Sequence, residues 1–310
     1  MTREHEILVG VDGSTASLHA LDWAAAEART RGLGIRAVVA YSLPSFTTTS
    51  LDGGYAALDD ETIRAGAQAV LDEALQHLGD AGVPVQGKVV TGDAAAVLVE
   101  ESRSVRLAVV GTRGRGGFAD RLLGTVSSAL PAHAWCPTVV VPLRGPDGHP
   151  LPEGEVPPLR PVARIVVGVD GSPAAERALR AAIREAEAWG SELYAVAGVP
   201  IASIAGTLAW LPSAVDHEQV LRDMREGLDV VVDRALADHP GVTVHRHALD
   251  GTGAELLTEF SDATDLVVVG SRGRGGFAGL LLGSTSQAVL HHARCPVMVV
   301  TTRCDEETTG

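Results

Sequence analysis

The stretch Ile7-Leu-Val-Gly-Val-Asp-Gly-Ser14 decides how this chain folds, because it returns as Ile165-Val-Val-Gly-Val-Asp-Gly-Ser172. Each copy is a short apolar run that ends in an aspartate, a glycine and a serine. Such a run, bounded by turn residues, is typical of a buried β-strand. The serine then opens a stretch with helical character, so both copies predict a strand that leads directly into a helix.

Two further motifs repeat at nearly the same distance. Gly111-Thr-Arg-Gly-Arg-Gly-Gly-Phe-Ala-Asp-Arg-Leu-Leu-Gly124 returns as Gly270-Ser-Arg-Gly-Arg-Gly-Gly-Phe-Ala-Gly-Leu-Leu-Leu-Gly283, and Cys136-Pro137 returns as Cys295-Pro296. The offset is 158 residues for the first motif and 159 residues for the other two. Solenoid repeats recur every 20–50 residues or so, roughly a third of this period at most. The sequence therefore indicates a duplicated domain.

The join between the two copies is visible as a change in composition. We predict a first domain over residues 1–145, a linker over 146–162, a second domain over 163–304 and a tail over 305–310. The linker is rich in proline and glycine and has no apolar period, which is typical of an extended tether.

Strands alternate with helical stretches in both halves, and the strands are apolar on both faces. This pattern predicts a parallel sheet covered on both sides, and the handedness of crossovers makes a doubly wound sheet the simplest topology. We therefore predict an α/β fold with two tandem Rossmann-like domains, each with five parallel strands in the order 3-2-1-4-5. The expected strands lie near 7–11, 35–40, 85–90, 107–110 and 138–141, and near 165–169, 193–197, 242–247, 266–269 and 297–300.

The composition excludes several classes of function. The formal net charge of −14 disfavours binding to nucleic acid or to an anionic membrane, although it leaves room for one local anion pocket. The chain has no apolar run of about 18 residues and no apolar leader, so we expect no membrane span and a cytoplasmic protein. The three cysteines form no metal-binding spacing. We expect Cys136 and Cys295 to be small buried residues.

The residues with the clearest chemistry follow the first and fourth strands. In a doubly wound sheet, ligands bind beyond the carboxyl ends of the strands, where the winding direction reverses. Glycine amides there can form a nest for phosphate oxygens, and the start of the next helix adds free N–H groups. The candidate nucleotide site of the first half is Gly10, Asp12, Ala40, Gly111, Thr112, Arg113, Gly114, Arg115, Gly116, Gly117, Arg121, Gly124, Thr125, Val126 and Ser127. That of the second half is Gly168, Asp170, Gly198, Gly270, Ser271, Arg272, Gly273, Arg274, Gly275, Gly276, Gly283, Ser284, Thr285 and Ser286.

Each part of this site has a plainer structural alternative. The glycine loop would serve equally as a turn before a capped helix, and its arginines as solvated loop residues. Asp12 and Asp170 would accept from ribose hydroxyls or cap the following helix, a role for which Ser14 and Ser172 are also suited. Ser127 and Ser286 would add hydroxyl donors to a phosphate. No Gly-Lys-Ser/Thr is present, and the GxGxxA match follows the fourth strand rather than the first, so neither familiar phosphate motif applies.

Taken together, Val-Asp-Gly-Ser after the first strand, the loop G-x2-G-x9-G-(S/T) and the closing Cys-Pro-x-x-Val-Val resemble the universal stress protein family in its tandem form. The G-x2-G-x9-G-(S/T) pattern marks the ATP-binding branch of that family. The resemblance implies that Asp12 and Asp170 contact ribose and that the loop glycines, with Thr125 and Ser284, hold phosphates. It also implies that adenine meets the chain near Ala40 and Gly198. ATP is thus the expected ligand, with Mg²⁺ bound alongside it.

The two halves differ inside the loop, where Asp120-Arg121 is replaced by Gly279-Leu280. Arg121 can donate to a phosphate and Leu280 cannot, so we predict tighter triphosphate binding in the first domain. No nucleophile–base pair is evident, and we expect His133, His291 and His292 to be surface or packing residues. A nucleotide-dependent stress-response or signalling module is the favoured function. An enzyme that hydrolyses ATP or transfers adenylyl or phosphoryl groups, and a scaffold that has lost its ligand, are the alternatives.

The fifth strands should be sheet edges. Their sequences, Thr138-Val-Val-Val141 and Val297-Met-Val-Val300, are apolar and uncharged, and such edges pair readily. We expect the two domains to pair through them about a pseudo-twofold axis, as the family resemblance also implies. Further pairing of two chains into a homodimer is compatible with this arrangement. The sequence does not identify a downstream protein partner.

Overall fold

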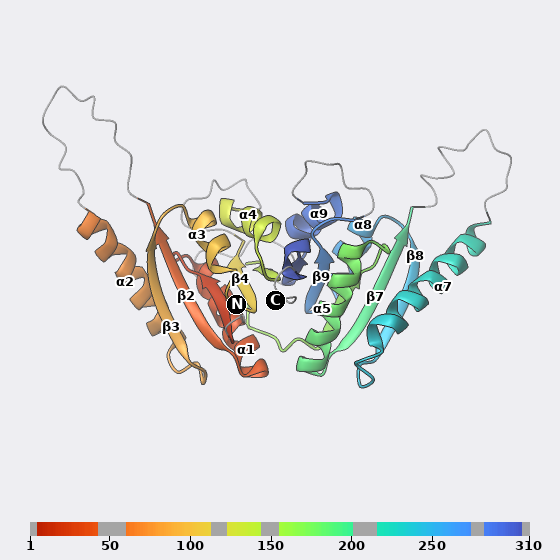
Figure 1. Ribbon diagram of the computed structural model, residues 1–310, viewed down its shortest axis with the longest axis horizontal. Coiled ribbons are helices and arrows are strands. Elements are labelled where there is room, and N and C mark those ends of the chain that lie inside the picture. The colour runs from red at the N-terminus through yellow and green to blue at the C-terminus, as the bar shows by residue number, and fades with distance from the viewer. Residues whose placement is uncertain are drawn as a thin grey trace, which may run out of the picture.

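The computed structural model describes residues 5–42, 60–112, 123–143, 155–200, 216–273 and 282–305 (Figure 1). The first domain contains β1 (Glu6–Gly10), α1 (Thr15–Arg31), β2 (Gly34–Tyr41), α2 (Asp60–Leu78), β3 (Val85–Thr91), α3 (Ala94–Glu101), β4 (Leu107–Gly111), α4 (Thr125–His133) and β5 (Thr138–Val141). The second contains β6 (Arg164–Gly168), α5 (Pro173–Trp189), β7 (Glu192–Val199), α7 (His217–Leu236), β8 (Val244–Asp250), α8 (Gly253–Phe260), β9 (Leu266–Gly270), α9 (Ser284–His292) and β10 (Val297–Val300). A short 3-10 helix, η1 (Thr302–Asp305), follows β10.

The strands of each domain run parallel in the predicted order. The sheet reads β3-β2-β1-β4-β5 in the first domain and β8-β7-β6-β9-β10 in the second. This confirms the doubly wound α/β fold and its duplication. The two sheets join into one ten-stranded sheet, because β5 and β10 pair antiparallel with Val139 opposite Met298. The prediction that the domains pair through their fifth strands is confirmed.

The core lies in two layers, one on each face of the sheet. Helices α1, α2, α5 and α7 cover one face, and α3, α4, α8 and α9 cover the other. Figure 1 shows the two domains side by side, with α2 and α7 at the outer ends. Cys136 and Cys295 are buried among the apolar residues of the second layer, as the sequence predicts.

The repeated Asp-Gly-Ser segments fix where α1 and α5 begin. The Ser14 hydroxyl accepts from the amide of Ser17, and Ser172 accepts from Ala175, so each helix starts with a serine cap. Both helices end at a glycine in the left-handed region, Gly32 with φ 64° and Gly190 with φ 66°. These matched caps place the N-terminus of each helix just beyond the strand that precedes it.

One predicted strand is displaced. The apolar pattern suggested a strand over 242–247, but β8 runs from Val244 to Asp250. It follows β7 in parallel register from Leu193 opposite Val244 to Val199 opposite Asp250. Backbone pairing with the neighbouring strand, rather than hydropathy, therefore sets its ends. The edge position explains the weak hydropathy signal, since no β8 side chain is fully buried and those of His245 and Asp250 are exposed.

The segment after β10 crosses to the first domain. The Thr301 hydroxyl donates to the carbonyl of Ala134 at 2.9 Å, and the Arg303 guanidinium donates to the carbonyl of His133 at 3.1 Å. The described part of the predicted linker, residues 155–162, has no helix or strand. We call the contact between the two domains, centred on β5 and β10, the seam.

Candidate nucleotide site

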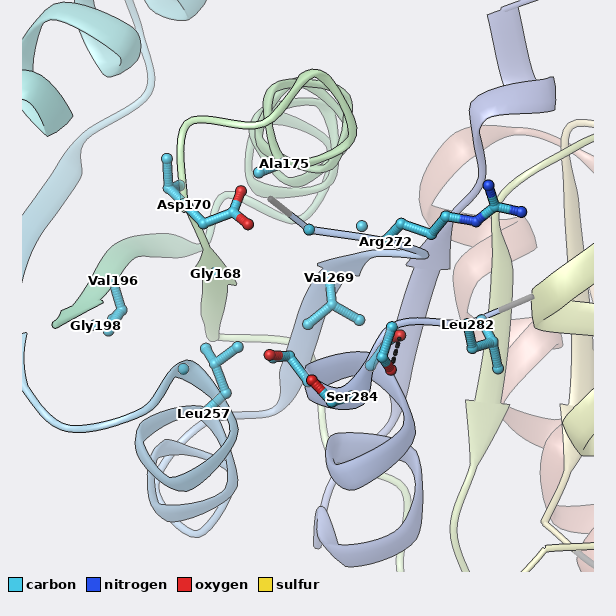
Figure 2. Close-up of a pocket in the computed structure, with 17 residues that line it drawn as sticks. Gly168, Asp170, Ala175, Val196, Gly198, Leu257, Val269, Arg272, Leu282 and Ser284 are labelled. Carbon is cyan, nitrogen blue, oxygen red and sulfur yellow. Dashed lines mark hydrogen bonds between the residues drawn. The ribbon is translucent and has the colours of Figure 1, made fainter. Parts of the chain in front are cut away.

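A cavity of about 380 Å³ opens beyond the carboxyl ends of β6 and β9. This is the place where the sheet changes winding direction, because β6 continues to β7 on one side and lies beside β9 on the other. Ten of the residues predicted for the second half line it: Gly168, Asp170, Gly198, Gly270, Arg272, Gly273, Gly283, Ser284, Thr285 and Ser286. Figure 2 shows these groups converging from β6, β9 and the start of α9 on one space.

Asp170 projects from the end of β6 into this cavity (Figure 2). Its Oδ1 accepts from the Ser172 amide at 2.9 Å, and in the first domain Asp12 Oδ1 accepts from the Ser14 amide at 3.0 Å. The serines, not the aspartates, cap the helices, so the alternative in which Asp12 and Asp170 are helix caps is wrong. The remaining oxygen, Oδ2 of Asp170, lies against the backbone of Gly273, where an added Cβ would overlap with it.

The start of α9 provides free amides on the opposite wall. Within the helix, the first backbone bond is from Gln287 to the carbonyl of Gly283, at 3.0 Å. The amides of Ser284, Thr285 and Ser286 come before that bond, so the helix itself gives them no acceptor. Together with the helix dipole they favour an anion, typically by about 0.3–1 kcal/mol per charge. In the first domain α4 begins in the same way, with Ser128 bonded to the carbonyl of Gly124.

Ser127 and Ser286 have a different role from the predicted one. The buried Ser286 hydroxyl lies 3.1 Å from the carbonyl of Ser271 and 2.9 Å from that of Gly283, and Ser127 lies 2.8 Å from the carbonyl of Thr112. A hydroxyl has one proton, and here backbone carbonyls take it. These serines therefore tie the end of the glycine loop to the strand instead of donating to a phosphate through the side chain.

Two of the predicted glycines, Gly111 and Gly270, are required by backbone packing, and two more lie close to leucine side chains. A Cβ at Gly111 would come 2.5 Å from the carbonyl oxygen of Ala16 in α1, and one at Gly270 would come 2.9 Å from that of Ala174 in α5. A Cβ at Gly10 or Gly168 would lie 2.7 Å from a leucine methyl of α3 or α8. Glycine at these strand ends lets helices approach the sheet closely, which is a packing reason for Gly111 and Gly270 in addition to the predicted phosphate contact. A Cβ at Gly273, in contrast, would meet the Asp170 carboxylate rather than a helix.

Some of the predicted site residues are not described by the structure or do not line the cavity. Arg113, Gly114, Arg115, Gly116, Gly117, Arg121, Arg274, Gly275 and Gly276 lie outside the described residues. Ser271 is buried and lies next to the cavity without lining it, although its carbonyl accepts from the Gly283 amide at 2.8 Å. Arg272 lines the cavity, and Figure 2 shows its side chain extended away from Asp170. The described first-half residues occupy the equivalent ends of β1, β2 and β4 and the start of α4: Gly10, Asp12, Ala40, Gly111, Thr112, Gly124, Thr125, Val126 and Ser127.

The sequence-based prediction did not include the apolar wall of the cavity. It consists of Val169, Ala175, Val196, Gly253, Leu257, Val269 and Leu282. Val196 and Val269 stand near the ends of β7 and β9, so the topology itself could have identified them. Leu257 reaches the site from α8, and nothing in the local sequence predicts that contact. An apolar floor beside polar groups is the usual composition of a pocket for a flat, partly apolar ligand.

Outside this cavity, the described residues were compared with two other kinds of functional feature, a metal site and a membrane-spanning helix. Within residues 5–42, 60–112, 123–143, 155–200, 216–273 and 282–305, no three His, Cys, Asp or Glu side chains gather closely enough to hold a metal ion. His133 and His291 are partly buried and His292 is exposed, and none of the three lines the cavity. No helix in the described ranges is both long enough and apolar enough to span a membrane.

Comparison with known proteins identifies the family to which this fold belongs. The family model described as "Universal stress protein family" matches residues 4–142 and again residues 161–301. This chain belongs to the universal stress protein family. It is 34% identical over 305 residues to "Universal stress protein Rv2005c" of Mycobacterium tuberculosis, covering 96% of this chain and 97% of that protein. It is also 34% identical over 303 residues to "Universal stress protein Rv2623" of the same species, covering 94% and 95%.

Two solved structures superpose on nearly the full length of this chain. A universal stress protein from Archaeoglobus fulgidus superposes with a TM-score of 0.65 at 21% identity and covers 96% of this chain and 97% of its own. A protein from Pseudomonas aeruginosa described as functionally unknown superposes with a TM-score of 0.58 at 16% identity, covering 96% and 92%. At these identities the likeness concerns the fold, which is that of a tandem universal stress protein.

Proposed function

We propose that this universal stress protein binds an adenine nucleotide, ATP with Mg²⁺, at the ends of β1 and β4 and of β6 and β9. The observation that carries the proposal is the convergence of Asp170, Gly273 and the first amides of α9 on one cavity. These groups match the parts of a nucleotide: a carboxylate for ribose hydroxyls, a backbone without Cβ and free amides for phosphates, and an apolar wall for the base. The cavity volume, about 380 Å³, is within the range of small-molecule sites, roughly 300–1,000 Å³.

We further propose that the bound nucleotide acts by changing conformation or partner affinity rather than as a substrate. The cavity lining contains one carboxylate, Asp170, and one guanidinium, Arg272, among the described residues, and Asp170 Oδ1 already accepts from Ser172. A general base would need a proton donor within hydrogen-bond reach and a free acceptor. Measuring the steady-state release of phosphate and pyrophosphate tests whether the nucleotide is a substrate. Turnover that saturates with ATP would support the alternative function, an enzyme that hydrolyses ATP or transfers adenylyl or phosphoryl groups.

The binding proposal is tested by titrating ATP into the wild type and into Asp170→Asn, Asp12→Asn and the double variant. Asparagine keeps an oxygen that accepts from Ser172, so the loop remains in place while the charged acceptor for ribose is lost. We expect each single variant to lose one site, by about tenfold or more in affinity, and the double variant to lose both. Asp238→Asn, which changes an exposed aspartate on the segment after α7, is the matched control.

The two sites are proposed to differ. Arg121 of the first loop is replaced by Leu280 in the second, and both residues lie outside the described ranges. A guanidinium near the phosphates favours a triphosphate over a monophosphate. The Asp170→Ala protein, which keeps the first site, should therefore prefer ATP over AMP more strongly than the Asp12→Ala protein. Equal preferences would contradict the proposed asymmetry.

A further inference from the structure

The duplication brings two copies of one glutamate together at the seam. Glu27 of α1 and Glu185 of α5 are 158 residues apart, the same offset as the Asp-Gly-Ser motifs, so they are equivalent positions of the two domains. The positions one turn later, Arg31 and Trp189, are also equivalent but differ in residue. Figure 1 shows the C-terminal ends of α1 and α5 facing each other below the sheet. We call these four residues the axial cluster, because equivalent positions meet at the pseudo-twofold axis.

The axial cluster is closely connected across the two domains. The Arg31 guanidinium lies 2.5 Å from Glu27 Oε1 and 2.6 Å from Glu185 Oε1. The indole N–H of Trp189 donates to Glu27 Oε2 at 2.6 Å. One arginine of the first domain therefore holds a carboxylate from each domain, and one indole of the second domain holds the carboxylate of the first.

The cluster is buried and its charges do not balance. Glu27 is fully buried and the Glu185 side chain is 7% exposed. Glu185 Oε2 is buried and has no hydrogen-bond partner in the part of the chain that the structure describes. With both carboxyl groups ionised the cluster would carry one uncompensated negative charge away from water, which is costly. One bound proton removes that charge and gives Oε2 a hydrogen to share.

Among the described residues, the charged groups that act on Glu185 are Glu27 and Arg31. On this face of the sheet, β5 and β10 present Val139, Val141, Met298 and Val300, which belong to the same apolar core layer as α1 and α5. His19 of α1 and Arg177 of α5 occupy equivalent positions two turns before Glu27 and Glu185. Further titratable groups lie near Trp23. There His19, Arg160, Asp262, Asp265 and Arg294 line a separate cavity of about 230 Å³.

We propose that the axial cluster is a proton-binding site that links the two domains: Glu27 and Glu185 share Arg31 and one bound proton, and loss of that proton in mildly alkaline solution weakens the seam. The proton is held by the Glu185 carboxyl and passes to solvent on release, which leaves a carboxylate. This site is independent of the nucleotide cavity, so failure of either proposal leaves the other standing.

The direction of the pH effect follows from the protonation states. Burial, aided by the nearby Glu27 carboxylate and opposed by Arg31, raises the pKa of Glu185 from 4.5 to about 8. The folded protein therefore holds one more proton than the unfolded chain between these two values. Stability contributed by the neutral cluster is complete below the unfolded pKa and is lost as the pH rises toward 8. One proton corresponds to about a tenfold change in the folding equilibrium constant per pH unit.

The test compares pH profiles of unfolding for the wild type and three variants. Glu185→Gln removes the carboxyl group that binds the proton and leaves one carboxyl group, Glu27, opposite Arg31. We expect the wild type to lose about tenfold in its folding equilibrium constant between pH 6 and pH 7 relative to Glu185→Gln, and Glu226→Gln, an exposed control on α7, to follow the wild type. The double variant Glu27→Gln/Glu185→Gln leaves Arg31 buried without a carboxylate and should be less stable than Glu185→Gln at all pH values.

Two measurements on the wild type keep the proposal testable if a variant fails to fold. Refolding in weakly buffered solution at pH 7 should take up about one proton through Glu185, offset in part by proton release from His19 and His247, whose pKa values burial lowers. Hydrogen exchange of peptides that contain β5 and β10, corrected for the intrinsic effect of pH, should show weaker protection at pH 8.5 than at pH 6.5. Parallel profiles for wild type and Glu185→Gln, or equal protection of the seam peptides at both pH values, would overturn the proposal.

Discussion

Oδ2 of Asp170 lies so close to the backbone of Gly273 that a Cβ at that glycine would overlap with it. The two residues follow the ends of β6 and β9, and both line the cavity. Glycine at position 273 therefore serves the carboxylate, not the local turn. This relationship favours the proposed ligand site over a glycine-rich turn, because a turn alone would not require an aspartate opposite the glycine.

Gly273→Ala should abolish nucleotide binding in the second domain without unfolding the protein. The added methyl group displaces the Asp170 carboxylate, so we expect a loss of at least about tenfold in affinity, equivalent to 1.4 kcal/mol. Gly227→Ala is the matched control, because Gly227 lies in α7 with no atom within 4 Å of an added Cβ. It should leave binding unchanged and increase the free energy of unfolding by up to about 1 kcal/mol. Equal affinities for the two variants would contradict the role given to Gly273.

Neighbouring serines at the start of α9 should separate stability from binding. Ser286→Ala removes a buried hydroxyl that bonds to the carbonyl of Ser271, so we expect a loss of about 1 kcal/mol in the free energy of unfolding. Ser284→Ala alters a residue that lines the cavity and should reduce ATP affinity with little effect on stability. Urea denaturation and titration of both variants check this division, and the reverse pattern would show that the two roles are interchanged.

Much of this architecture could be predicted because each motif occurs in both halves of the sequence, so each structural interpretation is supported twice. The Asp-Gly-Ser segments gave the caps of α1 and α5, and the apolar runs 138–141 and 297–300 predicted the pairing of β5 with β10. The site was predicted less well. Hydroxyls at 127 and 286 look like ligand groups in the sequence, but their partners are backbone carbonyls that only the folded chain brings close. The helices that pack against the glycines at 111 and 270 are likewise brought close only by the fold. The same holds for Glu27 and Glu185, which ordinary helix patterning would place in water.

The seam should depend on the hydrogen bond that follows β10. Thr301 is buried and donates to the carbonyl of Ala134 in the other domain, whereas Thr302 is exposed. Thr301→Val keeps the shape and leaves that carbonyl without its donor, so we expect a loss of about 1–2 kcal/mol in the free energy of unfolding. Thr302→Val should be nearly neutral. Identical urea midpoints for the two variants would argue against the contribution of this bond.

Thiol chemistry should follow burial. Burial raises the pKa of the Cys295 thiol to about 12, against an ordinary value near 8.5. Because the thiolate is the reactive form, Cys295 should resist alkylation at pH 8 in the folded protein, and reactivity should appear only as the pH approaches 12 or the chain unfolds. Cys304 is partly exposed and should react first. Mass spectrometry of alkylated peptides checks the order, and labelling of Cys295 at the rate of Cys304 would contradict it.

The most direct measurement of the central claim is mass spectrometry of the small molecules released when freshly purified protein is denatured. The account predicts an adenine nucleotide, with ATP as the main species, at one to two molecules per chain. Two per chain indicates that both domains are filled, and one per chain agrees with the difference between Arg121 and Leu280. If no nucleotide is released, and none binds on titration with Mg·ATP, then the loops after β4 and β9 are only turns and the proposed function is wrong.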